Sequence, residues 1–300
     1  MNYKKVTFLL VGLLISTINL NAQNYNRQKN NFILANIGIN GLAGGIGAAI
    51  NKKPNEKIGM VLLKGFSQGC LGGGFNVLGK EITYQIKVKE NIAYAWPARL
   101  TNAIGSSITQ NAAANINFWE QLHFNVGVLR LDYNVPDRKL KARFLTSAVY
   151  GIGVTASQAK FNPHKSLQSG ILIFERETPL TINGAPADGT GIVSSIGMNK
   201  NIGGSRFSSS RYHGVFAHEV AHIIQYETRS WLNPMFNKVN DKLKHKSSLY
   251  EKLAKYVYFD LNGPLYLGLY MSQINQPWEC RFAEREADLF SNKRVYSACR

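Results

Sequence analysis

The chain has 300 residues, of which 45% are hydrophobic and 18% are charged, so it can build a folded core and is not a disordered chain. Lysine and arginine number 35 against 18 aspartate and glutamate residues, and the net charge is +17. Such a surface attracts anions, which makes a membrane or an anionic envelope surface a candidate partner. An exported protein that is simply basic is the favoured interpretation. No block of basic residues is interleaved with aromatic ones, which argues against specific nucleic-acid recognition.

Residues 1–22 have the three parts of a secretory signal peptide. Lys4 and Lys5 precede an apolar run over residues 6–18, and Ala22 ends the stretch with a small side chain. This pattern predicts export to the periplasm, the cell envelope or the extracellular space. An uncleaved anchor helix is the alternative interpretation.

The three cysteines, Cys70, Cys280 and Cys299, are too few for a disulfide framework. Cys280 and Cys299 are able to pair in an oxidising compartment, although their spacing does not establish the bond. No CxxC motif is present, which excludes a zinc site built from cysteines.

Small residues recur every four positions in two apolar segments, 32–50 and 58–79, which a polar turn joins. They are Gly41, Gly45 and Ala49 in the first segment and Gly65, Gly69 and Gly73 in the second. On helices this spacing places small residues along one face and lets two backbones approach closely. Region 23–80 is therefore expected to be an antiparallel helical hairpin with a glycine seam. A charge at Lys64 is costly inside a bilayer, which favours a hairpin packed on the protein, with membrane association as the alternative.

Region 81–200 is expected to be rich in antiparallel strands. Alternating or extended patterns predict strands over residues 82–89, 122–128, 141–155, 168–176 and 190–198. A short helix is expected over residues 99–113, and turns are expected at 134–137, 183–184 and 188–189. Residues 203–210 are expected to form a polar loop, and region 201–300 is otherwise expected to be helical. The predicted fold class is thus α+β.

The segment VFAHEVAHII contains an HExxH motif formed by His218, Glu219 and His222. Positions four apart lie on one face of a helix, so the two imidazoles can share one Zn²⁺ ion. Glu219 projects beside them, where it can take a proton from a water molecule. The third histidine of a longer HExxHxxGxxH motif is absent, because Gln225 and Thr228 occupy those positions.

A further ligand is needed, and the downstream segment AEREADLF offers Glu284, Glu286 and Asp288. Glu284 and Asp288 are four apart and share a helical face, whereas Glu286 points elsewhere on the same helix. The pair of motifs resembles the gluzincin zinc metallopeptidases, and within them the peptidases of the CAAX-prenyl-protease type. That resemblance implies a zincin-like C-terminal region in which Glu284 is the third zinc ligand and Asp288 orients a ligand histidine. Glu286 and, less directly, Glu279 remain as alternatives to Glu284.

The motifs favour an exported zinc metallopeptidase that hydrolyses a peptide or protein substrate, with Glu219 as general base. Such a reaction also needs a group that stabilises the transition state, and His213, Tyr226 and His245 are the candidates. The resemblance implies that an edge strand near residues 190–198 binds the substrate as an added strand. The alternatives are a non-catalytic cell-envelope binding or scaffold protein that retains a zinc site, and an envelope protein that acts through its hairpin and strands.

Overall fold

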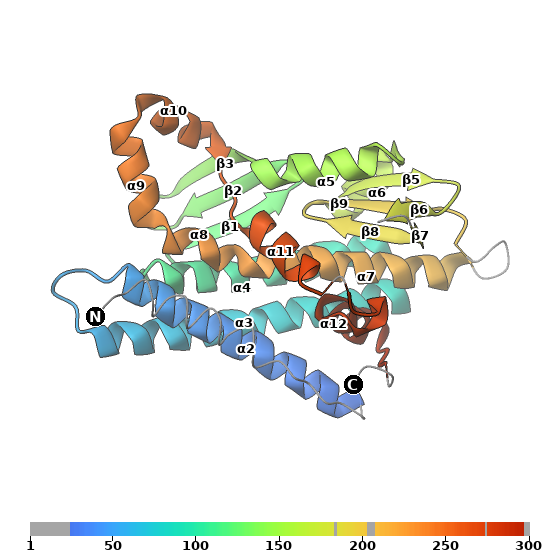
Figure 1. The fold of residues 1–300 in the computed structure, drawn as a ribbon, viewed down its shortest axis with the longest axis horizontal. Coiled ribbons are helices and arrows are strands. Elements are labelled where there is room, and N and C mark those ends of the chain that lie inside the picture. The colour runs from blue at the N-terminus through green and yellow to red at the C-terminus, as the bar shows by residue number, and fades with distance from the viewer. Residues whose placement is uncertain (1–24, 183–184, 203–207, 274, 297–300) are drawn as a thin grey trace.

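The structure is a computed structural model that describes residues 25–182, 185–202, 208–273 and 275–296. It has the predicted mixed α+β composition, with small sheets and a larger share of helix. Figure 1 shows two long N-terminal helices along one side of the molecule and the sheets on the opposite side. The predicted signal peptide, the turn at residues 183–184 and Cys299 lie outside the described residues.

The N-terminal helical layer contains α2 (Tyr25–Ile50), α3 (Ile58–Val88), the 3-10 helix η1 (Ile92–Tyr94) and α4 (Ala95–Ala113). The predicted hairpin corresponds to α2 and α3, which pack against each other (Figure 1). The predicted helix over residues 99–113 is present and begins four residues earlier, at Ala95.

The strand predicted over residues 82–89 is wrong, because α3 continues to Val88. Its sequence alternates between apolar and polar residues, but Ile82 and Ile86 are also four apart and share a helical face. Ile86 is fully buried in the main core, and Ile82 packs against that core. Tertiary packing therefore overrides the local alternation.

Glycines let α2 and α3 approach closely along the predicted seam. A Cβ atom added at Gly65 would lie 2.5 Å from the Gly44 carbonyl oxygen, and one added at Gly73 would lie 2.8 Å from Ile37 Cα. Contacts of this kind leave no room for a side chain. A second close approach joins α3 to α4, where a Cβ atom at Gly105 would lie 2.5 Å from the carbonyl oxygen of Gly72.

The strands are β1 (Gln121–Val126), β2 (Leu129–Asn134), β3 (Lys139–Leu145), β4 (Lys160–Phe161), β5 (Leu172–Arg176), β6 (Leu180–Ile182), β7 (Ala185–Ala187), β8 (Gly189–Ile192), β9 (Ser195–Asn199) and β10 (Val257–Tyr258). They form sheets of order β1-β2-β3-β10 and β4-β5-β9-β8, with β6 and β7 as a separate hairpin. Most pairs are antiparallel, as predicted, but β5 pairs with β9 and β3 with β10 in parallel. The described strands are thus not purely antiparallel.

Three of the other predicted strands need correction. The strand predicted at 141–155 ends at Leu145, and α5 (Thr146–Ala156) follows, because Ala148, Gly151 and Thr155 are buried at helical spacing. The segment at 168–176 begins in α6 (Pro163–Ser169) and becomes β5 only after Gly170, which has a φ of 71°. The segment at 190–198 is two paired strands, β8 and β9, rather than one.

The C-terminal region holds α7 (Ser208–Thr228), η2 (Arg229–Trp231), α8 (Leu232–Met235), α9 (Asn237–Lys246), α10 (Ser248–Tyr256), α11 (Asn262–Met271), η3 (Trp278–Cys280) and α12 (Phe282–Asn292). It is largely helical, as predicted, but it also contains β10, and the last three residues of the predicted loop at 203–210 begin α7. Helix α7 is central: it contacts α3, α4, α12 and β8. Figure 1 shows it running between the helical layer and the sheets.

Within the described residues, α2 is the one helix long and apolar enough to cross a membrane, and 44% of its most apolar stretch is buried in the protein. Core helices have the same length and composition, so the predicted membrane association stays a prediction. Lys64 is exposed on α3, next to the apolar outer face of the hairpin.

Candidate metal centre

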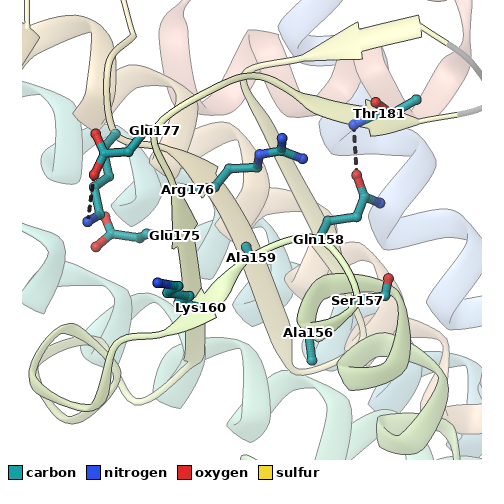
Figure 2. Close-up of a pocket in the computed structure, with 10 residues that line it drawn as sticks. Ala156, Ser157, Gln158, Ala159, Lys160, Glu175, Arg176, Glu177 and Thr181 are labelled. Atoms are coloured by element: carbon teal, nitrogen blue, oxygen red, sulfur yellow. Dashed lines mark hydrogen bonds and ion pairs between the residues drawn. The ribbon is translucent and has the colours of Figure 1, made fainter.

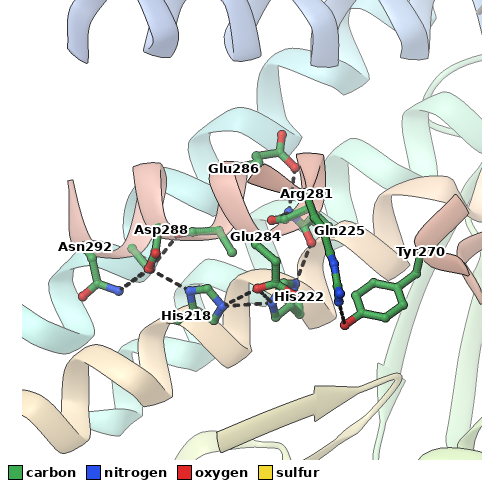
Figure 3. A network of polar contacts seen from close by, with 12 residues as sticks. His218, His222, Gln225, Tyr270, Arg281, Glu284, Glu286, Asp288 and Asn292 are labelled. Carbon is green, nitrogen blue, oxygen red and sulfur yellow. Dashed lines mark hydrogen bonds and ion pairs between the residues drawn. The ribbon is translucent and has the colours of Figure 1, made fainter. Parts of the chain in front are cut away.

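Helix α7 carries the HExxH motif through the middle of the protein. Phe216, Val220, Ile223 and Ile224 of this helix are fully buried in the main core, which fixes its rotation. With those residues facing the core, His218 and His222 point together toward α12 (Figure 3). The buried apolar residues around the motif therefore determine where its imidazoles lie.

Glu284 of α12 meets both histidines. Its Oε2 atom lies 3.0 Å from His218 Nε2 and 3.0 Å from His222 Nε2, and the two Nε2 atoms are 3.0 Å apart. All three side chains are buried. Two imidazole nitrogens and a carboxylate oxygen that converge in this way could hold a metal ion.

The electrostatics of this group favour a positive charge. Burial disfavours the imidazolium form, yet hydrogen bonds to Asp288 and Glu284 outweigh it and raise the pKa of His218 to about 10. Burial likewise opposes ionisation of Glu284, but His222 and His218 hold the pKa of this carboxyl well below its usual range. A proton or a cation between these groups is therefore stabilised.

Each histidine has a partner for its second ring nitrogen. His218 Nδ1 lies 2.9 Å from Asp288 Oδ1, and His222 Nδ1 lies 2.8 Å from Gln225 Oε1 (Figure 3). Trp278 of η3 stacks on the His218 ring, with the ring centroids 5.7 Å apart. With Nδ1 occupied, each imidazole directs Nε2 toward Glu284.

Glu219 lies on the sheet side of α7, against β8. A Cβ atom added at Gly189 would lie 2.9 Å from Glu219 Oε1, so the strand approaches this carboxylate closely. Glu219 is buried, and it accepts a hydrogen bond from the Gly191 backbone N–H. Burial raises the pKa of Glu219 above its ordinary value, against the opposing effect of the two histidines.

These groups open into a cleft of about 1920 Å³. Its lining includes His218, Glu219, His222 and Glu284, together with residues of β8. Residues of α5, α11, α12 and η3 are among those that form its other walls. The cleft is thus large enough for an extended peptide and gives it access to the candidate metal centre.

The three candidates for stabilising a transition state lie in different places. Tyr226 is buried and lines the cleft, and its hydroxyl is 2.5 Å from Ser147 Oγ. His213 lies on the first half of α7 with its Nδ1 atom 2.7 Å from the Ser209 carbonyl oxygen, and it does not line the cleft. His245 lies on α9, which Figure 1 shows at the far end of the molecule. Only Tyr226 is therefore brought to the site.

The alternatives for the third ligand lie apart from the histidines. Glu286 is buried on another face of α12, where it forms an ion pair with Lys80 at 2.8 Å. Glu279 belongs to η3, and its carboxylate is not part of the group that converges on the two histidines. The geometry thus favours Glu284 for this role.

Sequence reasoning missed several residues around the site. Tyr266 and Tyr270 of α11 line the cleft, and Arg281 donates a hydrogen bond to the Tyr270 hydroxyl at 2.8 Å. Burial raises the pKa of both tyrosines, so both keep their hydroxyl protons at neutral pH. In the sequence, only the spacing of four between the two tyrosines in an apolar segment points to a shared helical face. The same pattern is equally typical of a core helix, so it does not indicate a site.

A second hollow, of about 690 Å³, lies at the end of the β4-β5-β9-β8 sheet (Figure 2). It is lined in part by Glu175, Glu177 and Lys200, and Gln158 Oε1 accepts a hydrogen bond from the Thr181 backbone N–H at 2.8 Å. None of the predicted site residues lines it.

Comparison with known proteins returned no matching family model, no matching curated protein and no matching solved structure. The inference of function therefore rests on the site itself.

Proposed function

We propose that the protein is a zinc metallopeptidase that hydrolyses peptide bonds in a peptide or protein substrate. One observation carries the proposal: a buried carboxylate, Glu219, lies beside a convergent His218, His222 and Glu284 group in an open cleft. A structural metal site has no need of such a base or of an open cleft. The resemblance to gluzincins, with a zincin-like arrangement of α7 and α12, is part of this proposal.

The donor set fits zinc. Two neutral imidazoles and one carboxylate are the protein ligands of many catalytic zinc sites, which keep a further position open. A bound zinc ion supplies Lewis-acid activation of water and of a carbonyl group. Asp288 and Gln225 would hold the two imidazoles in the orientation that this ion requires.

Glu219 supplies the proton transfers. Its carboxylate would accept a proton from the attacking water and then pass it to the leaving amine. A pKa raised by burial brings this group closer to neutral pH, where a general acid and base works best. Tyr226 remains a candidate for stabilising the transition state because it lines the same cleft.

Strand β8 offers a binding edge for the substrate. It is the last strand of the β4-β5-β9-β8 sheet, and among the described strands it pairs only with β9. Its residues Gly189, Thr190, Gly191 and Ile192 line the cleft beside Glu219. An extended peptide would therefore add to this edge through backbone hydrogen bonds, which present its scissile bond to Glu219.

We further propose that the protein works outside the cytoplasm, near a membrane or an anionic envelope surface. The signal-peptide pattern of residues 1–22 and the net charge of +17 support this location. Exposed apolar side chains on the hairpin, among them Leu34, Met60 and Leu63, support the surface association.

The proposal is tested by incubating the purified, zinc-loaded protein with an unfolded protein and identifying new N-termini by mass spectrometry. Cleavage should occur, should stop when a chelator removes the metal, and should return when zinc is added back. Full zinc occupancy with no cleavage of any unfolded or peptide substrate would instead favour the alternative, a non-catalytic envelope protein that retains a zinc site.

A further inference from the structure

Gln225 connects the ligand His222 to a buried ion pair. Its Oε1 atom lies 2.8 Å from His222 Nδ1. Its Nε2 atom donates to Glu286 Oε2 and to the carbonyl oxygen of Ala283, both at 2.8 Å. Figure 3 shows Gln225 between His222 and Glu286. The amide thus uses opposite ends for the metal centre and for α12.

The helical hairpin holds Glu286 from the other side. Lys80 of α3 lies 2.8 Å from Glu286 Oε1, and Asn36 Nδ2 of α2 donates to the same oxygen at 2.5 Å. Lys80 also donates to Asn36 Oδ1 at 2.6 Å. Lys80 and Glu286 are each only 2% exposed, so this chain of contacts lies inside the protein.

The chemistry of these groups fixes the orientation of the Gln225 amide. An ionised carboxylate and a backbone carbonyl can only accept hydrogen bonds, so the NH₂ end of Gln225 must face Glu286 and Ala283. The carbonyl end of the amide must then face His222 Nδ1. Since that oxygen can only accept, Nδ1 carries a proton, and Nε2 is left to share a metal ion or a second proton with Glu284.

We infer that Lys80, Asn36 and Glu286 are positioning residues that set the tautomer of His222 through Gln225. The hairpin thereby takes part in building the metal centre, although none of its residues touches it. This inference rests on the metal site of the proposed function. Stability alone is a weak reason for such a pair, because apolar residues of similar volume often replace a buried ion pair without loss of stability.

The first test is Glu286→Gln in the full chain. The new amide can donate as well as accept, so only the Ala283 carbonyl still selects the parental orientation of Gln225, and the flipped orientation becomes accessible. ¹⁵N NMR of the metal-free protein should show that Nδ1 of His222 is protonated in the parent, whereas a share of the variant should have Nδ1 unprotonated. The zinc affinity of the variant should fall by about 10–100-fold, the range typical of groups that orient a ligand.

The matched control is Glu227→Gln. Glu227 lies on α7, the helix that carries Gln225. It forms an ion pair with Arg99 at 2.7 Å that is buried like the Lys80–Glu286 pair, but it does not contact Gln225 or Glu286. This variant should lose stability while keeping the parental His222 tautomer and zinc affinity. A shift of the tautomer in the control as large as that in Glu286→Gln would overturn the inference.

The double variant Lys80→Met/Glu286→Met removes both charges and so avoids a lone buried ion. It should fold, show both His222 tautomers and bind zinc about 10–100-fold more weakly than the parent. A single Nδ1–H tautomer in both test variants, or a parental zinc affinity in both, would overturn the inference. If the parent binds no zinc, the proposed function fails, whereas the tautomer in metal-free protein still decides the inference.

Discussion

His218 and Asp288 face each other across the α7–α12 interface, with 2.9 Å between the imidazole Nδ1 and the carboxylate Oδ1. Glu284, one turn earlier on α12, contacts Nε2 of the same ring at 3.0 Å. The two acidic residues therefore hold one imidazole from both of its nitrogens. Asn292 also donates to Asp288 at 3.2 Å, which keeps the carboxylate in place.

This relationship predicts the effect of Asp288→Asn. The carboxamide can present its NH₂ group to Nδ1 and favour the wrong tautomer, so zinc affinity should fall by about 10–100-fold. Titration of the metal-free protein against a competing chelator measures the change. Asp132→Asn, which alters a half-buried carboxylate far from α12, should leave zinc affinity unchanged; equal losses in both variants would refute a specific role for Asp288.

Removal of a ligand should be more severe than removal of its partner. His218→Ala, His222→Ala and Glu284→Ala each delete an atom that must touch the ion, so each should lower zinc affinity more than Asp288→Asn does. Zinc content of the dialysed proteins, measured by elemental analysis, gives the order. Stoichiometric zinc in Glu284→Ala at parental affinity would show that another residue is the third ligand.

The seam between α2 and α3 predicts that Gly69→Leu disrupts the hairpin. A Cβ atom at Gly69 would collide with the backbone of Asn40 and Gly41, and overpacking of this kind costs about 1–3 kcal/mol or more. Thermal unfolding should show a lower Tm. Gly74 is the matched control: it lies on the same helix with nothing within 4 Å of its Cβ position, so Gly74→Leu should not lower Tm. Equal Tm values for the two variants would rule out the seam as the cause.

The ion pairs of Asp132 are expected to make the stability of the folded protein depend on pH in the acid range. Burial opposes its ionisation, but Arg130 and Arg143 lower the pKa of Asp132 to about 2. A depressed pKa contributes stability that is present above the unfolded value near 4 and is lost as pH falls toward 2. The contribution at neutral pH is about 2 kcal/mol. Asp132→Asn should therefore be less stable than the parent at pH 7 in urea unfolding, and the difference should shrink between pH 4 and pH 2. A difference that does not change with pH would contradict this account.

The sequence predicted the metal motif better than the sheets. The four-residue spacings in α7 and α12 depend only on helix geometry, so the meeting of His218, His222 and Glu284 follows once the two helices pack. The strands predicted over 82–89 and past Leu145 were wrong for a different reason: a short apolar pattern fits either a strand or one helical face. Burial of Ile86 and Gly151 against other elements decides in favour of helix.

The contacts between distant segments of the chain could not be predicted from local sequence patterns. Asn36 and Glu286 are 250 residues apart in the sequence, and Lys80 has no motif of its own. Their meeting depends on how the glycine seam sets the hairpin against α12, which spacing within either segment does not encode. Tyr226 is the one candidate for stabilising the transition state that tertiary packing brings to the cleft.

Glu219→Gln separates the role of the base from the role of the metal ligands. The carboxamide keeps the shape of the side chain but cannot accept a proton, and Glu219 is not a member of the convergent His218, His222 and Glu284 group. Zinc content and cleavage of an unfolded protein should be measured on the same sample of the variant and the parent. We expect full zinc occupancy with cleavage lost in the variant; cleavage at the parental rate by the zinc-loaded variant would show that Glu219 is not the base.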